Sequence, residues 1–393
     1  MLAKYRVQFT LLILIAILIA TAVAIFWARG FKPDFKNRSI QRTGLIVASS
    51  IPTGANVYLD ERLTSATDTN IAFLAPKTYK VKIEKPGYTT WEKDIEIKAD
   101  LATEIKALLF PQAPEIKPLT ITGASNPSLS PDGSKIVYGV VGSAGGLYLL
   151  PMSDRPFPFR QGSRILAKNQ LGFDFSQALF TWSPDAKQVL VGFFDEKNQP
   201  TANLLIDSER TDQDLRDITG SLASTLDQWQ QEINSRAQTA ALTVPDSVKQ
   251  ATGEARQLEP TSLTAQSPNS LNYFPTGLVF SPDEEKILYQ NKEGKYGVYD
   301  LKTKKQYQLP DLVDLIHISW YPDSNHLVIA QNPPAGGLIS IIEADSTNKM
   351  TVYTGKYENG FVFAHPSATR LIILTSLTQS QGTAPNLYSI NLK

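Results

Sequence analysis

The chain has 393 residues, enough for a membrane anchor and two domains, and its 38 basic and 38 acidic side chains cancel. With no net charge, the protein has no overall positive potential that would attract nucleic acid. The sequence also lacks a Lys/Arg-rich block interleaved with aromatic residues, which would create such a potential locally. The sequence contains no cysteine, which excludes disulfides, thiolate metal sites and cysteine nucleophiles.

The first element is an uncharged apolar run, Val7–Ala28. At about 1.5 Å per residue, a helix of this length crosses a hydrocarbon core of about 30 Å. A cleavable signal peptide is the alternative, because Lys4 and Arg6 precede the run and Ala22-Val23-Ala24 could be a cleavage site. The apolar run continues past that site through Ile25-Phe26-Trp27, which favours an uncleaved single-pass anchor.

The charges on the two sides of the anchor do not settle its orientation. The linker, residues 29–42, is more basic than the N-terminal tail, residues 1–6. A large C-terminal part translocates largely regardless of charge, whereas a short basic N-terminus normally stays inside. We therefore expect a cell-membrane protein with its globular part outside the cytoplasm.

Residues 43–110 have the pattern of a compact β domain. Five short runs read as strands, several with alternation of apolar and polar residues: Leu45–Val47, Asn56–Leu59, Tyr79–Glu84, Trp91–Ile97 and Thr103–Leu108. The motifs Pro52-Thr53-Gly54-Ala55 and Lys85-Pro86-Gly87-Tyr88, the latter followed by Trp91, resemble those of the PEGA domain. Pro76-Lys77 departs from the glycine turn usual in that family. The resemblance implies a small antiparallel β-sandwich, a surface or envelope module without a shared catalytic site.

Residues 111–393 contain a repeated turn. Each copy follows an apolar run and leads into a β-branched one, and proline and aspartate favour a tight turn at that point. The copies are Ser130-Pro131-Asp132, Ser183-Pro184-Asp185, Ser281-Pro282-Asp283, Tyr321-Pro322-Asp323 and the degenerate His365-Pro366-Ser367. Their spacing is about the 40–50 residues that a four-stranded propeller blade requires, except for a doubled interval between Pro184 and Pro282. We expect a five-bladed β-propeller, with six blades as the alternative.

These turns resemble the TolB-like or WD40-like (PD40) repeat over roughly residues 115–393. The first copy fits best, with Ser-Pro-Asp-Gly at residues 130–133, while Ala186, Glu284 and Ser324 replace the glycine in later copies. These replacements should leave a type I turn possible but less tightly specified. The resemblance implies a scaffold, binding platform or substrate filter, and it assigns the turn residues a structural role. In matching places of their repeats, Trp182 and Trp320 should pack between blades.

The doubled interval is explained by a helical insertion at residues 215–252, where the apolar period changes from two to about 3.6. A helix could start after Ser221 or at Thr225, and Pro245 should introduce a second one, Asp246–Thr252. The stripe Leu222, Leu226, Trp229 and Ile233 is too apolar for water. It either packs on the rest of the protein or stays partly exposed as a partner-binding ridge.

The end of the chain indicates how the ring closes. Leu387–Leu392 is strand-like, and no later strand is left to complete its blade. The segment Ile116–Thr122, just before the first repeat, is available, so we expect it to pair within the last blade and remove an exposed edge.

The sequence offers little chemistry. It has no phosphate-binding loop, nucleophile elbow, zinc-protease or kinase signature, and we predict no catalytic, cofactor or metal site. The histidines His317, His326 and His365 lie beside repeats, where polar residues are usually structural. Asp212, Asp214 and Asp217 lack the glycine and glutamate of a calcium loop.

The function that we expect is a membrane-anchored binding or scaffold protein of the cell envelope. It would act through its propeller and PEGA domain on an envelope protein, a cell-wall glycan or a peptide, and not on nucleic acid. The alternative is a propeller enzyme of the glycan hydrolase or lyase type. Such an enzyme would gather carboxylates with histidine or arginine at the central channel.

Overall fold

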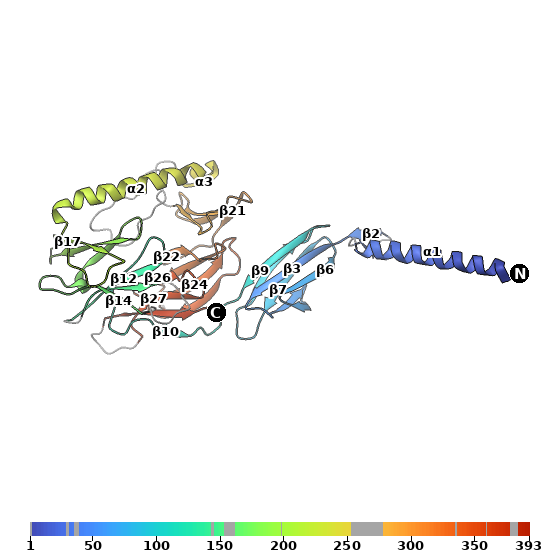
Figure 1. Cartoon of the computed structure of the whole chain (residues 1–393), viewed down its shortest axis with the longest axis horizontal. Coiled ribbons are helices and arrows are strands. Elements are labelled where there is room, and N and C mark those ends of the chain that lie inside the picture. Colours follow the sequence, from blue (N-terminus) through green and yellow to red (C-terminus); the bar gives the residue numbers. More distant parts are fainter. Residues whose placement is uncertain are drawn as a thin grey trace. The chain divides into compact units, whose positions relative to one another are not determined.

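The computed structural model describes residues 2–28, 31–34, 39–142, 145–152, 162–197, 199–252, 278–334, 336–358, 360–377 and 384–393. Two compact units divide the chain, Met1–Gln112 and Ala113–Lys393. Strands dominate both units (Figure 1).

The first unit begins with helix α1, Leu2–Ala28. In the part of the chain that the structure describes, no helix is both long and apolar enough to count as a membrane span, so the span expected over Val7–Ala28 is not confirmed. The expected linker contains a short antiparallel pair, β1 (Phe31–Asp34) and β2 (Ser39–Arg42).

The β domain of this unit is a sandwich of two sheets. One sheet has the order β6-β3-β9 (Thr69–Leu74, Gly44–Ile51, Ala102–Leu108) and the other β5-β4-β7-β8 (Arg62–Ala66, Asn56–Leu59, Thr78–Glu84, Trp91–Glu96). Alternate residues of β3 and β7, including Ile46, Ala48, Val81 and Ile83, are buried between the sheets. The expectation of a wholly antiparallel sandwich is wrong, because β3 pairs in parallel with β9. The chain crosses the second sheet before it returns at β9, and it arrives in the direction of β3.

The second unit contains five antiparallel sheets in its described residues. The first three are β11–β14 (Ser125–Leu129, Lys135–Val140, Gly146–Pro151, Arg164–Lys168), β15–β17 (Leu179–Trp182, Gln188–Phe194, Pro200–Asp207) and β18–β21 (Leu278–Phe280, Lys286–Gln290, Tyr296–Asp300, Lys305–Gln308). The last two are β22–β25 (Leu315–Trp320, His326–Gln331, Leu338–Glu343, Met350–Thr354) and β10-β28-β27-β26 (Ile116–Pro118, Asn386–Asn391, Arg370–Thr375, Val362–Ala364). In the first four sheets all sequential strands pair as a meander, as in a propeller, and the last sheet adds β10 to the meander β26–β28.

The pairing expected between the start and the end of this unit is present. Ile116 pairs with Ile390 and Pro118 with Tyr388, in antiparallel register. The Thr120 hydroxyl donates to Asn386 Oδ1 at 3.0 Å and accepts from the Leu387 N–H at 2.9 Å. The strand that follows the first unit therefore belongs to the same sheet as the last strands of the chain.

The β15–β17 sheet has three strands, and the insertion starts where its fourth would lie. A single bridge joins Leu204 to Asp217. The 3₁₀ turn Thr219–Ser221 and helix α2, Leu222–Thr243, follow, so the helix begins at the earlier of the two expected starts. Helix α3, Asp246–Thr252, comes directly after Pro245 as expected.

The two helices pack across two neighbouring sheets along one side of the unit (Figure 1). Trp229 of α2 is only 5 % exposed and packs with Leu190 and Ile218 at the β15–β17 sheet. Val244 and Val248, at and beyond the helix junction, pack with residues of the β18–β21 sheet. The insertion therefore bridges the two sheets that it separates in sequence.

Candidate functional site

The five repeated turns join the first strand of each sheet to the second, and their side chains fix the turn. Asp132 accepts hydrogen bonds from Ser130 Oγ at 2.6 Å and from the Ser134 N–H at 3.0 Å. Ser130 Oγ in turn accepts from the Lys135 N–H at 2.9 Å. Burial opposes ionisation of Asp132, but these hydrogen bonds outweigh it and hold the pKa of the carboxyl below its usual value. Asp185 and Asp283 make the same pattern of bonds in their own turns.

The residue after the aspartate position is left-handed in every copy. Its φ is 69° at Gly133, 58° at Ala186, 60° at Glu284, 60° at Ser324 and 53° at Ala368. The replacements of glycine therefore leave the same left-handed conformation in place. The hydrogen bonds of the turn impose the conformation on residues for which it costs about 1–2 kcal/mol.

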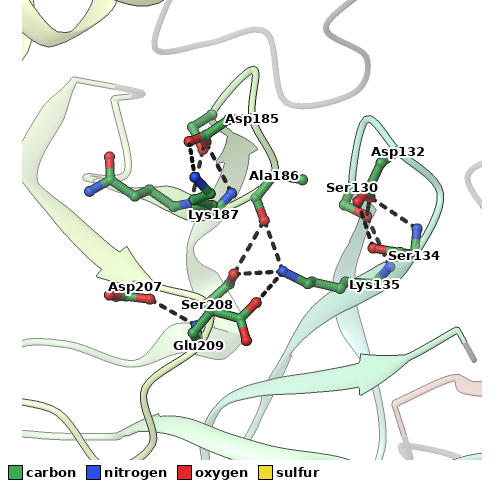
Figure 2. Close-up of polar contacts among 12 residues, drawn as sticks. Ser130, Asp132, Ser134, Lys135, Asp185, Ala186, Lys187, Asp207, Ser208 and Glu209 are labelled. Atoms are coloured by element: carbon green, nitrogen blue, oxygen red, sulfur yellow. Dashed lines mark hydrogen bonds and ion pairs between the residues drawn. The ribbon is translucent and has the colours of Figure 1, made fainter.

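Contacts between turns gather them at one end of the unit, here named the turn end. Lys135 Nζ donates to the Ala186 carbonyl at 3.1 Å, to Ser208 Oγ at 3.0 Å and to Glu209 Oε1 at 2.6 Å (Figure 2). This hydrogen bond from Lys135 holds the pKa of Glu209 below its usual value. Two further bonds join neighbouring turns, from the Asp283 N–H to Ser324 Oγ at 3.0 Å and from Tyr321 Oη to the Ala368 carbonyl at 2.6 Å.

A cavity of about 890 Å³ runs between the sheets. The first strands of all five sheets line it, together with prolines of four of the repeated turns. We call it the channel, since only the central space of a propeller is bordered by the first strand of every sheet. Its lining from those strands includes Ser128, Thr181, Val279, Ser319 and Phe363.

Two tryptophans of the channel wall hold neighbouring sheets together. The indole N–H of Trp182 donates to the Ser128 carbonyl of β11 at 3.2 Å, and that of Trp320 donates to the Val279 carbonyl of β18 at 2.9 Å. Both side chains are almost completely buried. The packing role expected for these two residues is confirmed.

The most informative groups in the channel are His317 and Ser319, two residues apart on β22. His317 Nε2 and Ser319 Oγ are buried and have no hydrogen-bond partner among the residues that the structure describes. The His317 ring lies edge-on to Phe363, with ring centroids 5.0 Å apart. Burial lowers the pKa of His317, so the imidazole is neutral at pH 7 and presents one donor and one acceptor nitrogen. A buried polar group without a partner is costly, and both residues belong to the lining of the channel.

The other histidines belong to the turns. His326 Nδ1 lies 2.6 Å from Asp323 Oδ2, and His365 contacts Ser367 and Arg370. The cluster that the sequence allows around His317 and His326 therefore divides between a turn and the channel. Sequence reasoning noticed His317 but missed Ser319, whose only signal is its spacing of two from that histidine in a strand.

The channel lining contains two titratable side chains within the described part of the chain, Asp132 and His317. Asp132 is occupied by its turn, so the carboxylates with histidine or arginine that an enzyme would need do not meet there. Nor do three metal-ligating side chains cluster anywhere in the described ranges. Asp212 instead pairs with Lys168 at 2.9 Å.

The four residues considered for partner binding lie on α2 and are turned largely inward. Trp229 is 5 % exposed and Ile233 is fully buried, while Leu222 and Leu226 are half-buried against the Leu190 and Ile218 cluster. Of the two alternatives for this apolar stripe, the structure has the one in which the stripe packs on the rest of the protein. It leaves only the edges of Leu222 and Leu226 accessible to a partner.

Comparisons with known proteins complete the description. The PEGA domain model matches residues 43–112. No curated protein matches the chain. Among solved structures, a putative TolB from Agrobacterium tumefaciens is 14% identical, with a TM-score of 0.24, and the match covers 68% of this chain and 78% of that one. TolB from Acinetobacter baumannii is 15% identical, with a TM-score of 0.28 and coverage of 77% and 65%.

A third similar structure is the β-propeller domain of the Trilobed protease from Pyrococcus furiosus. It is 12% identical, with a TM-score of 0.23, and the match covers 54% of each chain. The match to a protein-family model covers only the β domain of the first unit. The second unit is characterised by its five sheets and its repeated turns. The chain thus combines a PEGA domain match at residues 43–112 with a second unit of five propeller-like antiparallel sheets, in which a repeated turn joins the first two strands of each sheet.

Proposed function

We propose that this chain is a membrane-anchored binding protein of the cell envelope, with a propeller of five blades closed by β10. The propeller would receive an occupant in its channel, and in the sequence the PEGA domain comes between the anchor and the propeller. The occupant would be an envelope protein segment, a cell-wall glycan or a peptide.

The observation that carries this proposal is the pair His317 Nε2 and Ser319 Oγ, buried in a channel of about 890 Å³ without protein partners. This volume falls within the range of ligand pockets, roughly 300–1,000 Å³, which are mostly apolar with a few placed polar groups. Phe361, Phe363 and Ile316 supply the apolar surface around the pair.

Binding is favoured over catalysis because the lining supplies hydrogen-bonding and aromatic groups rather than an acid–base pair. A neutral imidazole beside a hydroxyl could act as a base, but general acid–base chemistry on a glycan needs two carboxyl groups flanking the bond. The one carboxylate of the lining, Asp132, already accepts three hydrogen bonds from Ser130 and Ser134.

The membrane location is supported by the uncharged run Val7–Ala28 and by large apolar side chains exposed along α1, from Phe9 at 68% to Ile25 at 51%. Such a surface is unfavourable in water and favourable in lipid. We expect the full chain to stay with membranes during alkaline carbonate washing. Release of the chain with a new N-terminus after Ala24 would contradict the anchor.

The channel is tested by filling it. The variant Ser319→Trp should abolish capture of a partner from envelope extracts by the full chain in detergent, whereas Ser235→Trp on the exposed face of α2 should capture as much as the unmodified protein. His317→Phe, which keeps the ring and removes its nitrogens, should weaken capture at least tenfold. Equal capture by Ser319→Trp and the unmodified chain would place the binding site elsewhere.

A further inference from the structure

Neighbouring sheets of the second unit pack directly on each other at several of their junctions. Successive residues of a strand point to opposite faces of its sheet, so each sheet offers one face to each neighbour. Val191 of β16 belongs to one apolar cluster with Val137 of β12, across the junction of the first two sheets. Leu288 of β19 and Leu327 of β23 share a cluster in the same way, and the first sheet shares one with the last. These junctions are held by side chains of the sheets themselves.

The junction between the β15–β17 and β18–β21 sheets, here named the seam, is built differently. Leu190 of β16 and Ile287 of β19 face the seam, because the residues that follow them in sequence pack toward the other neighbours. Leu190 packs with Trp229 of α2, and Ile287 packs with Val244 and Val248, at and beyond the end of that helix. In the described part of the unit, no apolar cluster contains side chains of both sheets. Helices α2 and α3, together named the clasp, therefore take the place of direct sheet-to-sheet packing at the seam (Figure 1).

The clasp holds the two sides of the seam unequally. On the β15–β17 side, the large side chain of Trp229 packs at the sheet. Two backbone hydrogen bonds also tie the segment before α2 to β17, from the Leu205 N–H to the Arg216 carbonyl at 3.0 Å and from the Ile218 N–H to the Asn203 carbonyl at 2.8 Å. On the β18–β21 side, α3 brings the smaller Val248, and its Ala251 carbonyl accepts from the Lys292 N–H at 3.1 Å. Because hydrophobic stabilisation scales with buried apolar area, α3 is the part of the clasp that separates more easily.

The seam leads from the outside of the unit to the channel. Trp182 of β15 and Val279 of β18 line the channel on the two sides of the seam. In the channel wall, His317 Nε2 and Ser319 Oγ are buried, so an occupant reaches them only after part of the wall moves. Among the described residues, parting the two sheets of the seam breaks no apolar cluster that they share, whereas parting the first two sheets breaks one.

We propose that the seam is the entrance of the channel and that the clasp closes it. An occupant enters when α3 separates from the β18–β21 sheet, while α2 stays on the β15–β17 sheet. The pairing of β10 with β28 keeps the ring closed at its other junction. This inference rests on the proposed function, because it supplies the route by which an occupant reaches the channel.

The test measures how often the channel opens. Because the chain contains no cysteine, Ser319→Cys places a single thiol in the channel of the full chain in detergent. The rate at which N-ethylmaleimide labels this thiol, followed by mass spectrometry, reports the population of the open form, since a buried thiol reacts only after local opening. Val248→Ala, which truncates a fully buried side chain of the clasp, should speed labelling roughly fivefold or more.

The matched control is Val298→Ala, because Val298 is equally buried but packs at the junction between the third and fourth sheets. This control should leave the labelling rate unchanged. Should Val248→Ala not fold, Val244→Ala takes its place, since Val244 packs in the same cluster.

Two results would overturn the proposal. Equal labelling rates with and without the clasp substitution would place the entrance at an end of the channel. Equal acceleration by the clasp substitution and the control would mean that the whole propeller loosens rather than the seam. The labelling experiment uses no partner, so failure of this entrance and failure of partner capture are separate outcomes.

Discussion

Replacing Trp229 by alanine tests whether the helical insertion is part of the propeller core. The indole is 5% exposed and packs with Leu190 and Ile218, with Leu205 and Leu226 partly buried around it. Truncation of a buried tryptophan costs about 3–5 kcal/mol, and the half-buried surroundings favour the lower end, about 3 kcal/mol. At roughly 2–4 °C per kcal/mol, the melting temperature should fall by roughly 6–12 °C.

The assay is thermal unfolding of the full chain in detergent, followed by circular dichroism. Gln228→Ala, at the exposed neighbouring position of the same helix, is the control and should melt within about 1 °C of the unmodified protein. A Trp229→Ala variant that melts with the control would refute the packing argument. If that variant also lost its partner, the stripe would be a binding ridge after all.

Three further results are expected. Ala186→Gly should raise the free energy of unfolding, measured by denaturant titration, by about 1 kcal/mol, because glycine tolerates the φ of 58° that strains alanine. The control Ala178→Gly, at a residue whose φ is −83°, should show no gain. Between pH 7 and pH 5 the free energy of unfolding should fall by up to about 1.4 kcal/mol per pH unit. The reason is that His317 takes up a proton below its ordinary pKa of 6.5 in the unfolded chain, whereas burial lowers its pKa in the folded protein. Melting curves of His317→Phe should lack this loss. Thr120→Val should lower the free energy of unfolding by about 1–3 kcal/mol, because it leaves the Leu387 N–H without its hydrogen-bond partner. The same change at the exposed Thr122 should have no such effect. Equal melting temperatures of the two variants would show that this hydrogen bond does not contribute to stability.

Strand positions with strong local signals could be predicted from the sequence. Asn56–Leu59 has the same bounds in prediction and structure, because a proline-glycine turn precedes it and its apolar residues alternate. Strands β5 and β6 were missed because they are short and mostly exposed, with no clear alternation. The parallel pairing of β3 with β9 has no local signal either, since it depends on the path between them.

The candidate site was less predictable for a related reason. The channel forms only when first strands from five distant segments meet, and no single repeat reveals that His317 and Ser319 will lack partners. In the repeated turns, the left-handed position is occupied by residues other than glycine in four of the five copies. Asp185 and Ser183 enforce the same backbone around Ala186 through their own hydrogen bonds.

The pairing of β10 with β28 also bears on how the protein is made. Thr120 and Leu387, which bond across this junction, are 267 residues apart. At roughly 5–20 residues per second, a ribosome needs tens of seconds to supply the second partner after the first has emerged. During that interval the edge of β10 is open to foreign strands. We therefore expect the nascent chain to depend on a chaperone or on delayed folding after export, and slowing translation late in the message should increase aggregation.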